Sequence, residues 1–325
     1  MKAQNISIIG LGRLGASVGL AIKQSALNVT VVGHDRNADI ANIAMSSVGA
    51  VDKVEPNVRS LAARADILVL TVPMSELEPL LSVIGSDIRP HTLVLDFSSL
   101  KQPGLKWAAK YLPQGHYVGA SPVLAANWLS DGRVELEAAS ADLFKNSIFC
   151  LMPSSQADPQ AVETAVNFGS RLGATPYFVD PLEYDSLVQG LEAVPGLLGA
   201  AMFRAITQST GWRDMLRFAG LSFAQTTQPL SAGADIAYQV MNNKVATLRW
   251  LDALIEEMQA MRRLINESEA EMLSSIFADL HAERERWLAD RSKNEWAEGV
   301  TPEIQGNTIS SQLLGAFGRK RKQDE

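Results

Sequence analysis

The chain has 325 residues, enough for two domains, and 46% hydrophobic and 20% charged residues, as in ordinary soluble globular proteins. The formal net charge of -7 argues against a nucleic-acid-binding surface. A single cysteine, Cys150, excludes an internal disulfide framework and predicts a cytoplasmic location. The first four residues show no signal-peptide pattern, and no apolar run reaches the length of a bilayer span, so we expect no membrane contact.

A strand, a glycine-rich turn and a helix are predicted at the start of the chain. Ile6–Ile9 has the pattern of a buried strand, and a helix is expected to run to about Ser25. The glycine spacing between them predicts a dinucleotide phosphate site, with the phosphates at the helix N-terminus. The loop residues expected to bind the cofactor are Gly10, Leu11, Gly12, Arg13, Leu14 and Gly15.

The cofactor's ribose is expected to meet the end of a second strand, Asn28–Gly33. Asp35 follows this strand, and an acidic side chain there accepts hydrogen bonds from both ribose hydroxyls and repels a 2′-phosphate. We therefore expect NAD as the cofactor. Arg36 can pair with a 2′-phosphate, so NADP is the alternative.

Strands and helices alternate through residues 1–180, which predicts a Rossmann-type doubly wound α/β sheet domain. The expected strands are 52–54, 65–73, 92–97, 117–120, 148–152 and 176–179, and the expected helices are 38–46, 76–84 and 159–172. Val72 and Pro73 end a buried strand at the carboxyl edge, where such folds bind ligands, and we expect them to contact the cofactor.

Residues 181–290 lack a strand pattern and are predicted to form an all-helical domain, with long segments at 182–209, 236–265 and 267–288. Pro195 and several glycines in the first segment predict a kink or close packing. Residues 291–325 are polar and are predicted to be a disordered tail. We expect the helical domain to form a homodimer through apolar positions, namely Leu197, Leu198, Met202, Leu248, Leu251 and Met258.

The motifs resemble, in order and spacing, those of the prephenate/arogenate dehydrogenase family. They are the glycine loop, Gly33-His34-Asp35-Arg36, Ala65-Asp66 through Val72-Pro73, Asp96-x-x-Ser99-x-Lys101, Leu143-Phe144 to Pro153, Leu172-Gly173-Ala174, Tyr184-Asp185 followed by Pro195, Arg213-Asp214-x-x-Arg217-x-Ala219 and Asn243. The resemblance covers roughly residues 5–288. It implies oxidative decarboxylation of a small carboxylated substrate, prephenate or arogenate, in tyrosine biosynthesis.

The sequence departs from the family pattern where the family carries histidines. Gly119-Ala120-Ser121-Pro122 stands for G-x-H-P, so a serine replaces the histidine that contacts the substrate hydroxyl in the family. Glu192-Ala193-Val194-Pro195-Gly196 stands for S-H-x-P-H, and Tyr184 occupies a further histidine position. These changes leave open a different substrate or weak activity.

Ser121 and Ser99 are the candidate catalytic residues, because each follows a strand's carboxyl end and could bond a substrate hydroxyl or the nicotinamide amide. The alternative is that each serine only caps the chain at this junction, which is a common role for serine.

Arg217 is expected to bind a substrate carboxylate, or else to pair only with Asp214. Lys101 either attracts an anionic substrate or faces solvent. Glu192 could bind an amine, act as a base, or lie on a solvated helix face. No metal site is predicted.

Two other readings remain open. The chain could be a non-catalytic NAD-binding protein that kept the fold and lost the chemistry. It could also be another two-domain reductase, of the 6-phosphogluconate or pyrroline-5-carboxylate type, although the Asp96-x-x-Ser99-x-Lys101 and Arg213-Asp214-x-x-Arg217 motifs argue against that.

Overall fold

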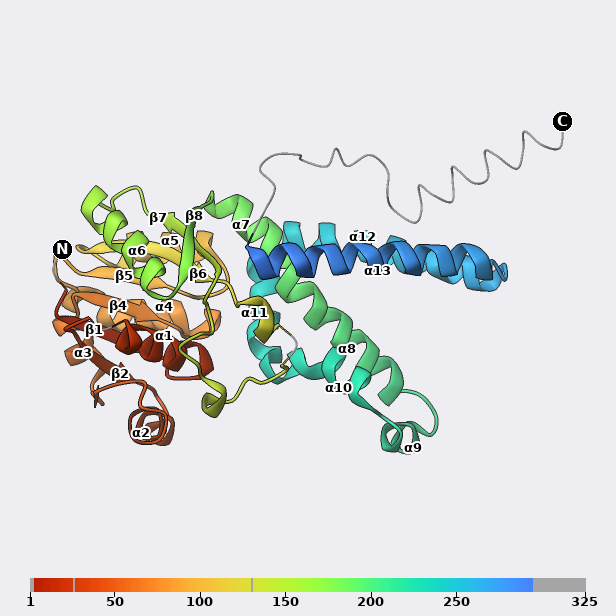
Figure 1. Ribbon diagram of the computed structural model, residues 1–325, viewed down its shortest axis with the longest axis horizontal. Coiled ribbons are helices and arrows are strands. Elements are labelled where there is room, and N and C mark those ends of the chain that lie inside the picture. Colours follow the sequence, from red (N-terminus) through yellow and green to blue (C-terminus); the bar gives the residue numbers. More distant parts are fainter. Residues whose placement is uncertain (1–2, 26, 130, 295–325) are drawn as a thin grey trace. The chain divides into compact units, whose positions relative to one another are not determined.

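The computed structural model describes residues 3–25, 27–129 and 131–294. By contact density the chain divides into two compact units, Met1–Lys244 and Val245–Glu325. The first unit holds an eight-stranded sheet in the order β3-β2-β1-β4-β5-β6-β7-β8, followed by helices (Figure 1). All strand pairs are parallel except β6 with β7. This arrangement confirms the predicted α/β fold class with a helical region after it.

The strands are short, and those in the middle of the sheet are mostly buried, as expected for a sheet covered on both faces, whereas the edge strands β3 and β8 are largely exposed. They are β1 Asn5–Ile9, β2 Thr30–His34, β3 Lys53–Val54, β4 Ile67–Leu70, β5 Leu93–Asp96, β6 His116–Pro122, β7 Ser147–Pro153 and β8 Ala174–Phe178. The helices of the sheet region are α1 Arg13–Gln24, α2 Ala38–Ser46, α3 Val58–Arg64, α4 Met74–Ile84, α5 Lys101–Tyr111 and α6 Pro159–Arg171, and the short 3-10 turns are η1 Gly85–Asp87, η2 Ala126–Trp128 and η3 Leu136–Ala138. The sequence pattern did not predict α3, which is short, or α5, whose first turn contains Pro103 and Gly104.

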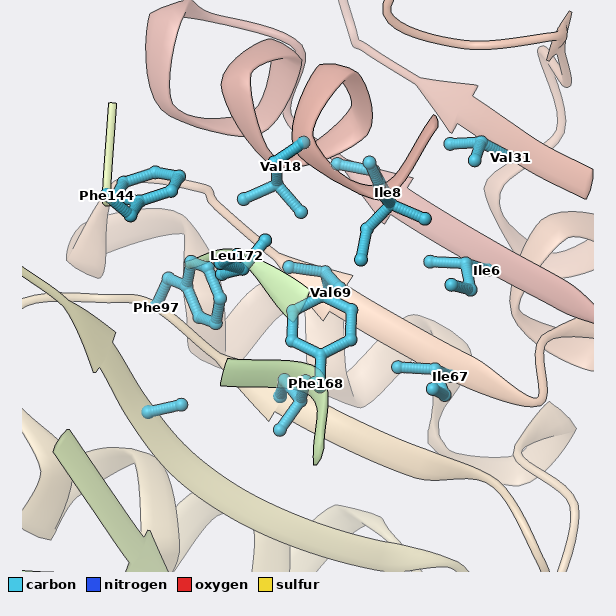
Figure 2. Close-up of a cluster of buried hydrophobic side chains, with 14 of the residues drawn as sticks. Ile6, Ile8, Val18, Val31, Ile67, Val69, Phe97, Phe144, Phe168 and Leu172 are labelled. Atoms are coloured by element: carbon cyan, nitrogen blue, oxygen red, sulfur yellow. The ribbon is translucent and has the colours of Figure 1, made fainter. Parts of the chain in front are cut away.

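Two hydrophobic clusters cover the two faces of the sheet, because successive strand residues point to opposite sides. Ile8 and Val69 belong to one cluster, which includes residues of α1 and α6 (Figure 2). Ile9 and Leu68, their neighbours in sequence, belong to the other, with residues of α3, α4 and α5. Helices on both faces leave the carboxyl edge of the sheet as the place for a ligand.

Beyond β8 the described chain is helical. The elements of the first unit are α7 Pro181–Val188, the π-helical turn η4 Gln189–Ala193, α8 Val194–Thr207, α9 Trp212–Arg217, α10 Leu221–Thr227, the 3-10 turn η5 Gln228–Ala232 and α11 Gly233–Asn242. A Cβ placed on Gly196 would lie 2.6 Å from Ile236, and one on Gly199 would lie 2.5 Å from a backbone oxygen of Thr226. The kink or close packing that the sequence predicts for this segment therefore takes two forms. There is a π turn just before Pro195, and there is close packing at these two glycines.

Pro181–Thr207 forms one helical run that is long and apolar enough, by those criteria alone, to span a membrane. The expectation from the sequence, that no apolar run reaches the length of a bilayer span, is therefore wrong for this segment by length and composition. The core helix of a soluble protein meets the same criteria, and α8 packs against α10 through Gly199. Length and composition are therefore weak evidence for a membrane span here.

Within the described residues, the second unit holds the helices α12 Lys244–Asn266, whose first residue belongs to the first unit, and α13 Ala270–Lys293. Ala260, Leu264 and Ile276 form its buried core. The expected helix 236–265 is thus two helices, α11 and α12, since Asn243 leaves the helical conformation at φ -137° and ψ 55°. Helix α13 extends into the segment predicted as a tail, and residues 295–325 lie outside the described residues. The predicted domain boundary near residue 180 matches the point after which no strand follows in the described residues. The division of the chain into two compact units falls later, at Lys244.

Candidate active site

The glycine loop adopts the geometry that its sequence predicts. Gly10 has a φ of +94°, and the Thr71 hydroxyl donates to its carbonyl oxygen at 2.6 Å. A Cβ on Gly15 would lie 2.0 Å from the same oxygen, so only glycine fits there. Gly12, in contrast, has no atom within 4 Å of the place of a Cβ, and it begins α1 without a side-chain cap. The loop thus leaves open space against the N-terminus of a helix, as a pyrophosphate requires.

A cavity of about 350 Å³ lies at the carboxyl ends of β1, β2 and β4. Its lining includes Gly10, Gly12, His34, Asp35, Arg36, Thr71, Val72, Pro73 and Glu76. Asp35 accepts the Leu11 N–H with one carboxylate oxygen and the Asn37 N–H with the other, both at 2.8 Å. Each oxygen keeps a further lone pair. The remaining acceptor positions of Asp35 and the open loop therefore fit the ribose hydroxyls and the pyrophosphate of an adenosine dinucleotide.

Gly12→Ala tests this phosphate site with little disturbance of the protein. The added methyl group meets nothing in the chain, so we expect only the small fall in unfolding temperature that comes from losing glycine at the N-cap of α1. Because the methyl group occupies the space of the pyrophosphate, calorimetric NAD titration should show affinity reduced by about tenfold or more. Gly233→Ala, another glycine with open space, is the matched control. Unchanged NAD affinity in Gly12→Ala would place the phosphates elsewhere.

The side chain of Arg13 does not serve the cofactor as expected. Its guanidinium binds both carboxylate oxygens of Asp131, at 3.0 and 2.5 Å, and donates to the carbonyl of Ala138 at 3.2 Å and to that of Arg133. It holds the loop between β6 and β7, and only its backbone N–H remains for a phosphate. Leu11 is buried and Leu14 half-buried, so these two also contribute backbone alone.

A group of hydroxyls lies at the carboxyl ends of β5 and β6. The Tyr184 hydroxyl, from α7, donates to Ser121 Oγ at 2.7 Å. Ser99 Oγ is buried and has no hydrogen-bond partner. A buried hydroxyl without a partner costs stability, so Ser99 Oγ needs a bound water or a ligand atom as its hydrogen-bond partner. Three strand spacings, about 14 Å, separate the end of β6 from that of β1.

Lys101 is neither at the substrate nor in solvent. Its side chain is completely buried, and its ammonium donates to the carbonyls of Asp96 at 3.0 Å, Ala120 at 2.9 Å and Ser98. Burial lowers the pKa of Lys101, while the nearby charges of Asp96 and Asp185 oppose that shift. All three N–H donors are in use, so Lys101 ties the ends of β5 and β6 together instead of binding an anion.

Asp185 fixes helix α7 to the sheet region. Its carboxylate accepts the backbone N–H groups of Lys101 at 2.6 Å and Gln102 at 2.8 Å, which caps α5. Burial raises the pKa of Asp185, against the effect of these hydrogen bonds. Asn243 donates to the Asp185 carbonyl at 2.9 Å. The neighbouring residue, Tyr184, is thereby held at Ser121.

Glu192 lies on the π turn, a distortion that is frequent at functional sites. Its side chain is accessible to solvent, yet surrounding protein raises its pKa by desolvation. Burial also raises the pKa of Tyr184, and the charge of Glu192 adds to that shift. Glu192 therefore places a negative charge near the Tyr184–Ser121 pair.

Within one chain, Arg217 does not lie near Ser121, Tyr184 and Glu192. It lies on α9, at the end of α8 remote from the sheet (Figure 1). The 14 residues of α8 span about 21 Å. The side chain of Arg217 is 79% exposed and pairs with Asp214 at 3.2 Å, which is the alternative that the sequence had left open.

Four residues of the site were not among the predicted site residues, although His34 and Tyr184 lie in the motifs described above. Thr71, His34 and Glu76 line the cofactor cavity, and Tyr184 bonds Ser121. His34 directly precedes Asp35 and Thr71 directly precedes Val72, so position in the chain could have indicated both. Glu76 and Tyr184 reach their partners across long sequence separations, which no local pattern reveals.

Comparison with known proteins agrees with this architecture. Residues 18–177 match the family model for the nucleotide-binding domain of prephenate dehydrogenase. A prephenate dehydrogenase of Bacillus subtilis is 26% identical over 278 residues, which cover 84% of this chain and 73% of the relative.

Solved structures share the fold. Prephenate dehydrogenase from A. aeolicus, in complex with hydroxyphenyl propionate and NAD+, has a TM-score of 0.73 at 18% identity and covers 87% of this chain and 98% of its own. Synechocystis arogenate dehydrogenase has a TM-score of 0.65 at 20% identity, with 87% and 100% covered. With the family match and the motifs, residues 18–177 belong to the family of prephenate dehydrogenase nucleotide-binding domains.

Proposed function

We propose that the protein is a nicotinamide-dependent dehydrogenase that oxidises a carboxylated cyclic alcohol of the prephenate or arogenate class, with loss of carbon dioxide, and that it prefers NAD. The observation that carries this proposal is the Tyr184–Ser121 hydrogen bond at the carboxyl end of β6. This pair of hydroxyls at the position of the family's histidine, in a sheet whose other edge positions fit a dinucleotide, supports the proposal.

Ser121 and Tyr184 would hold the substrate hydroxyl, because each hydroxyl can donate one hydrogen bond and accept others. Ser99 Oγ would gain the partner that it lacks, either from the nicotinamide amide or from the substrate. Bound NAD would supply the hydride acceptor. Positioning of this kind contributes several kcal/mol to catalysis before any proton acceptor acts.

Proton removal is expected to be slow. Ser121 is an alcohol, and the pKa of Tyr184 is raised by burial, so neither is a base near neutral pH. Glu192 adds negative charge, which repels a second substrate carboxylate and attracts an ammonium group. Arogenate, which carries an amine, should therefore be a better substrate than prephenate.

Turnover by the purified protein tests this function. Prephenate and arogenate are each supplied with NAD and with NADP, and reduced cofactor is followed. We expect slow turnover, faster with arogenate and with NAD. NAD binding without turnover of either compound would instead support the non-catalytic alternative.

We also propose that the protein is a homodimer in the cytoplasm. Large apolar side chains remain exposed on the helices of both units, including Phe218 and Leu221 in the first and Leu248 and Met258 in the second. Large apolar side chains that stay exposed favour a surface that is covered by a partner. Light scattering at micromolar concentration should give twice the chain mass of 35.2 kDa, and a monomeric mass would contradict the proposal.

A further inference from the structure

Three charged residues meet at the outer rim of the cofactor cavity. Asp35 and Arg36 follow β2, and Glu76 lies in the first turn of α4. All three line the same cavity. Their formal charges sum to one negative charge, so the rim opposes an anionic ligand group.

The Arg36 guanidinium is paired with the Glu76 carboxylate. The Arg36 side chain is 79% exposed, whereas that of Glu76 is 34% exposed, so Glu76 is the more fixed partner. A carboxylate in the first turn of a helix is also favoured by the helix dipole. The arginine that could bind a 2′-phosphate is therefore already engaged by a carboxylate of the cavity wall.

We propose that Glu76 is a determinant of cofactor specificity, which excludes NADP by holding Arg36 and by placing a second carboxylate beside Asp35. This inference rests on the dinucleotide site of the proposed function, but not on turnover. A 2′-phosphate at this rim would meet two carboxylates and an arginine that already pairs with one of them through Nη1, so the phosphate would have to compete with Glu76 for Arg36. NAD carries a hydroxyl at that position and meets no such repulsion.

Glu76→Gln is the direct test, because it removes the charge and keeps the size of the side chain. Calorimetric titration of the whole protein should show NADP affinity increased by about tenfold or more, since Arg36 becomes free to pair with the phosphate. The NAD affinity should change by less than about threefold, because the ribose acceptor Asp35 is unchanged. Adding Arg36→Ala should abolish the gain for NADP.

Glu78→Gln is the matched control on the same helix. Glu78 pairs with Lys110 and Tyr111 and does not line the cavity, so its loss should leave both affinities as in the wild type. An unchanged NADP affinity in Glu76→Gln, with NAD still bound, would overturn the role of Glu76 alone. Failure of the wild type to bind NAD would overturn the cofactor site itself, so the two failures are distinguishable.

Discussion

Replacing Ser121 with histidine is expected to raise the rate of prephenate oxidation at saturating NAD by up to about 10²–10⁴-fold, the usual contribution of a placed general base. The imidazole would stand at the carboxyl end of β6, where Ser121 now accepts the Tyr184 hydroxyl. The gain should grow as pH rises through about 6.5, because only neutral imidazole accepts the proton. Tyr184 would donate to the new histidine and compete for its lone pair, which limits the gain.

Ser155→His, in the exposed loop after β7, is the control for the substitution itself and should leave the rate unchanged. Robust turnover by the wild type that falls in Ser121→His would show that the site already holds an effective base. Glu192, whose pKa is raised by desolvation, would then be the first residue to replace.

Lys101→Met is expected to lower the free energy of unfolding by about 3–5 kcal/mol, because three buried carbonyls lose their hydrogen-bond donors. The cost is partly offset, since the charge of the ammonium no longer has to be buried. Denaturant unfolding measures the loss. Lys101→Gln keeps two N–H donors and should lose less.

Lys110→Met provides the comparison on the same helix. Lys110 is exposed and pairs with Glu78, so its replacement should leave the unfolding midpoint unchanged. For Lys101→Gln we expect a lower midpoint with an unaltered KM for the substrate. If Lys101→Gln instead has the unfolding midpoint of the wild type and a raised KM, Lys101 contacts the substrate.

The sheet and the glycine loop were predictable because their signals are local. Buried parallel strands are continuous apolar runs, as in Ile67–Leu70, and the constraints on Gly10 and Gly15 follow from a turn of a few residues. The helix α2 matched its predicted bounds, Ala38–Ser46, because Asn37 caps it.

Side-chain partners across the fold were not predictable. The spacing Asp96-x-x-Ser99-x-Lys101 places a lysine near the sheet edge, but only the fold shows that it turns inward onto three carbonyls. Arg217 matches a family motif, yet the length of α8 carries it away from Ser121. Such outcomes depend on contacts between residues far apart in sequence. Helix and strand propensities and hydrophobic periodicity describe only local sequence and do not predict these contacts.

Prephenate and arogenate labelled with deuterium at the hydroxyl-bearing ring carbon test the proposed dehydrogenation most directly. If the Ser121–Tyr184 pair holds the hydroxyl against the cofactor, mass spectrometry should find the deuterium in the reduced NAD. The label should also slow the wild-type rate, because hydride and proton removal limit turnover when no base is present. Reduced NAD without deuterium, or bound NAD that is never reduced, would contradict the account.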